Sequence, residues 1–182
     1  MTEAAPAGPP GVRGGSAPWA IASGVLFWAA FPPVGLWPLS FAGGACLVEA
    51  LLRARSLRSA AAAAFLAKLA FAPVYWYLWG VHPLMFLLFA CNISAGWALF
   101  GAAFHAARRW RGEAVAVALV PFLWPVFDWL SPRFCSIPSE LVDWPVAFGH
   151  TFLRGLAPYT GFYGLSALAA AVSAAPRLWR TP

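Results

Sequence analysis

Three side chains in one polar stretch are of the types that carry out hydrolysis and acyl transfer. Residues 131–157 include Cys135, Asp143 and His150. A thiol, a carboxylate and an imidazole can serve as nucleophile, orienting acid and general base. A triad is recognised by its geometry, however, and most short polar loops contain such a trio. The spacing leaves catalysis open without predicting it.

A metal or redox centre needs ligands at short, regular spacings. His82 and His150 have no close ligand pair, and the three cysteines Cys46, Cys91 and Cys135 are far apart. Cys46 and Cys91 lie in apolar stretches, where a thiol behaves as a small hydrophobic group. We predict no metal and no cofactor.

Two charged side chains interrupt strongly apolar stretches. Lys68 lies in residues 59–79 and Asp128 in residues 114–131. Ionisable groups at membrane depth are functional candidates by default. As helices, the two stretches place these groups within about 7 Å of the same depth. Three interpretations remain open: a buried ion pair that orients helices, a lysine extended towards headgroups, and a contact with lipid phosphate or a partner.

The composition predicts an integral membrane protein. Of 182 residues, 62% are hydrophobic and 10% are charged, whereas a soluble domain has about 25% charged residues. The net charge of +6 does not indicate nucleic-acid binding, because the basic residues fall in short groups between apolar stretches. We expect phospholipid and other membrane protein subunits as partners.

The predicted fold is all-α, a bundle of about six transmembrane helices with an outer interfacial or re-entrant segment. Residues 1–17 and 176–182 are predicted as tails, the first of them disordered, and 18–175 as the helical domain with an outer loop at 131–157. The predicted helices are 18–32, 36–52, 59–79, 83–107, 114–131 and 158–175. The first is only about 22 Å long, shorter than a bilayer core of about 30 Å.

Arginines predict the orientation. If the helices alternate in direction, one side carries Arg13, Arg53, Arg55, Arg58, Arg108, Arg109, Arg111, Arg177 and Arg180. Arg133 and Arg154 fall on the other side. The positive-inside rule then places both termini in the cytoplasm.

The connection FPPVGLWPLSF, residues 31–41, predicts a tight outward-facing turn. Its proline pair ends the first helix, Gly35 permits a reversal, and Pro38 suits the first turn of the second helix. We expect Phe31 and Trp37 to lie at headgroup depth as aromatic anchors.

The outer loop 131–157 is predicted to lie along the membrane interface and to cover a groove among the last four helices. Arg154 either contacts a phospholipid phosphate or faces solvent. The side chains expected to enter lipid are Ile137, Leu141, Trp144, Val146 and Phe148.

Within the helices, several polar and small residues predict packing contacts. Glu49 and Arg53 have the spacing of a salt bridge, and Asn92 and Ser94 suit hydrogen bonds to a neighbouring helix. The small residues expected to permit close helix packing are Gly43, Gly44, Gly96 and the run Ala60–Ala64.

Four stretches, in order over about residues 24–175, resemble the membrane portion of the apolipoprotein N-acyltransferase family, which N-acylates bacterial lipoproteins. Each stretch by itself is a weak signal, because it consists mainly of proline, glycine and aromatic residues in an apolar chain. They are FPPVGLWPLSF from Phe31, PVYWYLWGVHPL from Pro73, PFLWPVFDWL from Pro121, and DWPVAFGH from Asp143 followed by LRGLAPYTGFYGLSAL.

The resemblance implies a fold, and a location in the inner membrane of a bacterium, rather than a reaction. The family's chemistry belongs to a nitrilase-like domain with a glutamate, lysine and cysteine triad. Only seven residues follow Ala175, so we expect no such domain, and the single lysine is Lys68. Asp128 stands where the family has glutamate. The resemblance transfers no catalytic residue to this sequence.

We therefore predict a non-catalytic membrane module that docks lipid or serves as a subunit of a membrane complex. The alternative is the membrane half of a split or truncated acyltransferase whose catalytic domain is on another chain. A small transporter would need a charged pathway, for which the sequence offers little. The candidate lipid- or partner-binding residues are Arg154, Asp128, Lys68, Trp144 and His150.

Overall fold

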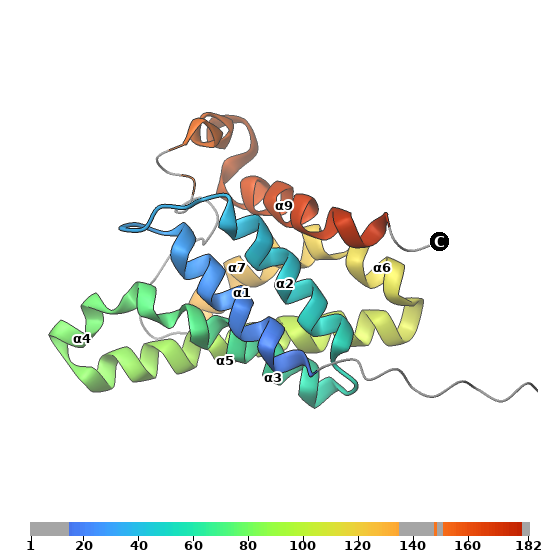
Figure 1. Cartoon of the computed structure of the whole chain (residues 1–182), viewed down its shortest axis with the longest axis horizontal. Coiled ribbons are helices and arrows are strands. Elements are labelled where there is room, and N and C mark those ends of the chain that lie inside the picture. Colours follow the sequence, from blue (N-terminus) through green and yellow to red (C-terminus); the bar gives the residue numbers. More distant parts are fainter. Residues whose placement is uncertain (1–14, 135–147, 149–150, 180–182) are drawn as a thin grey trace, which may run out of the picture.

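The computed structural model describes residues 15–134, 148 and 151–179, except the side chains of Ser131, Pro132 and Phe134. The described chain is all-α, as predicted, with eight α-helices and two short 3-10 helices (Figure 1). The α-helices are α1 (Ser16–Ala30), α2 (Leu39–Arg53), α3 (Leu57–Phe71), α4 (Tyr77–Val81), α5 (Pro83–Arg111), α6 (Glu113–Ala118), α7 (Val120–Phe134) and α9 (Ala157–Leu178). The 3-10 helices are η1 (Ala72–Tyr75) and η2 (Phe152–Leu156).

Three predicted helices are interrupted. The stretch 59–79 divides into α3, η1 and α4, with Pro73 in the first turn of η1, because proline lacks the N–H that continues a helix. The stretch 114–131 divides into α6 and α7 on either side of Leu119. In α9 the chain bends at Gly161, whose φ of 66° is a conformation that favours glycine.

Two described segments are long and apolar enough to cross a membrane, Leu57–Tyr75 with 19 residues and Pro83–Arg111 with 29. The second is about 43 Å long at about 1.5 Å per residue. The shorter α1, Ser16–Ala30, is also apolar. The structure therefore supports two candidate spans.

Helix α3 packs closely against two neighbours through small residues. A methyl group on Gly24 of α1 would lie 2.2 Å from the carbonyl oxygen of Ala67. One on Gly101 of α5 would lie 2.3 Å from the carbonyl oxygen of Ala60. Both contacts bring backbones together, the arrangement on which helix association in lipid depends. The prediction for Ala60–Ala64 and Gly43 is confirmed, whereas Gly24 and Gly101 were not singled out from the sequence.

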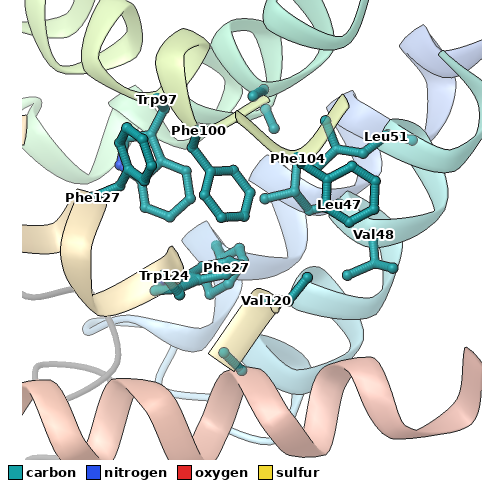
Figure 2. Packing of buried hydrophobic residues seen from close by; sticks show 14 of the residues in the cluster. Phe27, Leu47, Val48, Leu51, Trp97, Phe100, Phe104, Val120, Trp124 and Phe127 are labelled. Atoms are coloured by element: carbon teal, nitrogen blue, oxygen red, sulfur yellow. The ribbon is translucent and has the colours of Figure 1, made fainter. Parts of the chain in front are cut away.

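An aromatic core lies beside this contact (Figure 2). Trp124 of α7 is fully buried, with ring centroids 4.7 Å from Trp97, 5.6 Å from Phe100 and 5.8 Å from Phe27. These rings come from α1, α5 and α7, so they join these three helices to one another. The contacts of Trp124 with Trp97 and Phe100 are edge-to-face, and such pairs each contribute about 0.5–1.5 kcal/mol beyond area burial.

The predicted turn between α1 and α2 is confirmed, but the predicted position of one of its two aromatic residues is not. Gly35 has a φ of 70° and Pro38 precedes the first residue of α2. Phe31, however, is buried and packs edge-to-face on Phe71 at 5.0 Å. The prediction that Phe31 lies among headgroups is wrong, because the turn folds its ring inward onto α3. Trp37 is partly buried against Phe41.

Arginine side chains join helix ends at one end of the bundle, which we call the arginine-rich end. Glu49 of α2 binds Arg53 at 2.5 Å, as the spacing predicted. It also binds Arg177 in the last turn of α9, a contact 128 residues apart in sequence. The carboxylate therefore holds the end of α9 against α2.

Arg108 of α5 closes the C-terminal end of α2. Its Nη1 donates to the carbonyl oxygens of Leu51 at 3.2 Å and Leu52 at 2.6 Å, and its Nη2 donates to that of Ala54 at 2.6 Å. The last carbonyls of a helix have no partner within it. A cation at that position also complements the helix dipole.

The turn at 31–38, α4 and η2 lie in the left part of Figure 1, away from the C-terminus and α6. We call this the opposite end of the bundle. The helices thus connect alternately at two ends, in agreement with the alternation that the sequence predicted.

Gly101→Ala tests the close packing of α3. The added methyl group meets a backbone oxygen, so we expect the free energy of unfolding to fall by about 1–3 kcal/mol. Thermal unfolding of the detergent-purified chain measures this. Gly80→Ala is the control, because Gly80 has open space around it. Equal stability of the two variants would contradict the packing.

Candidate functional site

The five candidate residues fall into separate places. Trp144 and His150, like Cys135 and Asp143, lie outside the described residues. Lys68 and Asp128 are buried within the bundle, whereas the side chain of Arg154 is exposed in η2. The structure does not bring Arg154 together with the two buried charges.

Lys68 points into the bundle. Its side chain is 8% exposed, and its Nζ lies 4.5 Å from the ring centroid of Phe71 and 5.2 Å from that of Trp97. An ammonium group over an aromatic face gains about 0.5–2 kcal/mol, more when desolvated. The interpretation that Lys68 extends towards lipid headgroups is wrong, since its stem and head are enclosed by α1, α5 and α7.

A small cavity of about 20 Å³ adjoins Lys68. That volume holds one water molecule, which needs polar partners to be stable there. Ser23 Oγ lines the cavity and has no hydrogen-bond partner among the described residues. Its other lining residues are Phe27, Leu47, Ala64, Ala67, Lys68, Phe71, Trp97 and Trp124. A cavity of this size is too small to hold a lipid.

Asp128 lies on the side of α7 that faces this cavity. It is 4% exposed and follows Trp124 by one helical turn, so the two share a helix face. Trp124 lines the same cavity as Lys68. The ion pair between Lys68 and Asp128 stays a prediction, and the shared face supports it.

At the opposite end, Phe148 fixes the outer loop to α2. Its ring is 1% exposed, stacks on Phe41 at 5.6 Å and meets Trp37 edge-to-face at 6.0 Å. The prediction that Phe148 enters lipid is wrong, because these two rings at the start of α2 bury it. The prediction that the outer loop covers a groove among the last four predicted helices stays a prediction, because residues 135–147 and 149–150 lie outside the described residues.

Arg154 follows this anchor in η2. Thr151 begins the 3-10 helix, its Oγ1 accepting a hydrogen bond from the N–H of Leu153 at 3.2 Å. Among the described residues, the guanidinium of Arg154 makes no hydrogen bond or ion pair. The side chain is therefore available for a phosphate or carboxylate, with which arginine forms paired hydrogen bonds.

Exposed aromatic rings surround this end, and we call them the outer aromatic surface. Phe152 is 79% exposed and Tyr159 88%, although Phe152 also touches Trp37 at 6.2 Å. The members are Trp76, Tyr77, Trp79, Phe152, Tyr159 and Phe162. They come from α4 with the residue before it, η2 and the first turns of α9, segments in the left part of Figure 1. Aromatic rings with a polar atom favour the membrane interface.

Sequence reasoning missed most of this surface as a site. The stretches PVYWYLW and APYTGFY were read only for their resemblance to a family. The available signal was the dense aromatic residues beside proline and glycine, because proline and glycine end helices near the interface.

Ser94 also differs from its prediction. Its hydroxyl donates a hydrogen bond to the carbonyl oxygen of Ala90 in its own helix at 2.6 Å, and not to a neighbouring helix.

Comparison with known proteins gives one match. The family model for the apolipoprotein N-acyltransferase N-terminal domain matches residues 23–175. No curated protein and no solved structure matches the chain.

A double-mutant cycle tests the pairing of Lys68 with Asp128. Lys68→Met and Asp128→Leu each leave a buried charge alone, which costs about 3–5 kcal/mol of stability. The double variant is expected to recover most of that loss, since no unpaired charge remains. Thermal unfolding of the four proteins measures the coupling. Losses that add without recovery would show that the two groups are not partners.

Proposed function

This chain belongs to the family of the apolipoprotein N-acyltransferase N-terminal domain, and we propose that it is a lipid-docking membrane module that performs no acyl transfer by itself. Acyl transfer, where the module takes part in it, belongs to a domain on a partner chain. The exposed rings of Phe152, Tyr159 and Phe162, which lie near Arg154 in the sequence, are the observation that carries the proposal.

Placement in a membrane is supported by which side chains face outward. Large apolar side chains are exposed along α1, α5, α7 and α9, among them Val25, Leu99, Val126 and Val172. Four ionisable groups within the helices are buried instead, namely Glu49, Lys68, His105 and Asp128. This is the reverse of a soluble bundle, and it suits a family that is membrane-associated.

We further propose six passes through the inner membrane of a bacterium, formed by α1, α2, α3 with η1, α5, α6 with α7, and α9. The arginine-rich end then faces the cytoplasm and the outer aromatic surface the other side. Two of these segments, α1 and α2, have only 15 residues each, so the bilayer thins around them or flanking residues reach the interface.

Lipid docking at the outer aromatic surface follows from its chemistry. Phe152 and Phe162 offer apolar rings to acyl chains, while the hydroxyl of Tyr159 suits the headgroup layer. The guanidinium of Arg154 lies among them in sequence and is exposed. An arginine beside aromatic rings binds a lipid phosphate while the rings contact the chains.

A second function is favoured by the extent of the family match. Residues 23–175 match the N-terminal domain, so the chain is suited to hold a catalytic domain that another polypeptide supplies. Native mass spectrometry after gentle extraction separates the two cases. A co-purifying nitrilase-like protein favours a split acyltransferase, and a complex of unrelated subunits favours a docking subunit.

Photo-crosslinking tests lipid docking directly. The purified chain is mixed with a phospholipid that carries a diazirine in its acyl chain, and labelled peptides are identified by mass spectrometry. We expect labels in residues 152–163, and about a tenfold loss there in Arg154→Gln, since one charge-assisted contact is worth about 1.4 kcal/mol.

Arg133→Gln is the matched control, because Arg133 is also exposed and its guanidinium binds its own helix at Trp129 O. Unchanged labelling in Arg154→Gln, or equal loss in both variants, would contradict docking at Arg154.

A further inference from the structure

A second pocket lies at the arginine-rich end, far from Arg154. It has a volume of about 300 Å³ and is lined by residues of α1, α2 and α9. In Figure 1, α2 lies between α1 and α9. Small-molecule sites begin at about this size. The residues that line it are Trp19, Ala45, Cys46, Glu49, Arg53, Ser173, Pro176 and Arg177.

The charges of this pocket favour an anion. Two guanidinium groups, Arg53 and Arg177, line it with one carboxylate, Glu49. The carboxylate binds both arginines and leaves one positive charge in excess. Glu113 does not line this pocket, but it lines an adjoining hollow of about 160 Å³ that shares Glu49, Arg53 and Arg177 with it. An anion that enters the pocket therefore meets a positive potential.

The arginines are also held in place. Glu49 orients both, and the guanidinium carbon of Arg53 lies 5.0 Å from the ring centroid of Trp19. A guanidinium has five N–H donors, so one that binds a carboxylate can also donate to a second oxyanion. Such preorganisation lowers the entropy that binding must overcome.

We propose that this pocket binds the phosphate group of an anionic phospholipid. The apolar flanks of α1 and α2 beside it would contact the glycerol and acyl chains, and Trp19 at the pocket wall would do the same. A free phosphate has the same oxyanion chemistry, so the experiment compares the two sources. The proposal uses the proposed membrane placement but not the docking of lipid at Arg154.

The test is native mass spectrometry of the full chain released from nanodiscs. One set contains phosphatidylcholine alone, and the other contains added phosphatidylglycerol. We expect the wild-type chain to retain phosphatidylglycerol preferentially, and Arg177→Gln to reduce its retention at least fivefold. Arg109→Gln is the control, because Arg109 is exposed near the same end and does not line the pocket.

One further variant tests the pocket itself. Ala45→Phe fills the pocket and keeps every charge, so it is expected to abolish preferential retention. Retention that is unchanged in Ala45→Phe would overturn the proposal.

Alkylation of Cys46 identifies the source of the phosphate. In a Cys91→Ser and Cys135→Ser background, N-ethylmaleimide reports on the pocket wall. Protection by phosphatidylglycerol but not by inorganic phosphate supports a lipid site. Protection by inorganic phosphate in detergent indicates a soluble phosphate instead, a result that holds whether or not lipid docks at Arg154. Protection by neither overturns the proposal.

Discussion

The close contact of α3 with α1 and α5 is the constraint on which the rest of the structure depends. Gly24 and Gly101 let the neighbouring helices approach the backbone of α3 at Ala67 and Ala60. In lipid, helices gain no hydrophobic energy from association, so such contacts must supply it. The same contacts bring Phe27, Trp97 and Trp124 together in one core.

The positions of the charged side chains follow from that packing. Once α1, α3 and α5 are fixed, Lys68 is enclosed by aromatic rings and becomes an interior group. Glu49 and Arg108 join the remaining helix ends to α2, so that arginine side chains gather at one end. The other end is left with aromatic rings and Arg154. The two ends thus have different chemistry, and the two proposed lipid sites differ accordingly.

Local signals were readable from the sequence, and long-range partners were not. Gly35, the salt bridge of Glu49 with Arg53, and the uninterrupted α5 follow from spacing and residue type. The second partner of Glu49 could not be found, because Arg177 is brought near only by the whole bundle. Burial of Phe31 and Phe148 was missed for a related reason. An aromatic residue beside a turn can face lipid or the core, and only tertiary packing decides which.

The central claim is a bundle that crosses the membrane with its arginine-rich end on one side and Arg154 on the other. Cysteine labelling of closed vesicles with an impermeant maleimide measures this, in a variant whose three native cysteines are serine. We predict that Trp110→Cys is labelled only from the cytoplasmic side, and Val34→Cys and Gly155→Cys only from the opposite side. Labelling of Trp110→Cys and Gly155→Cys from the same side would contradict the account.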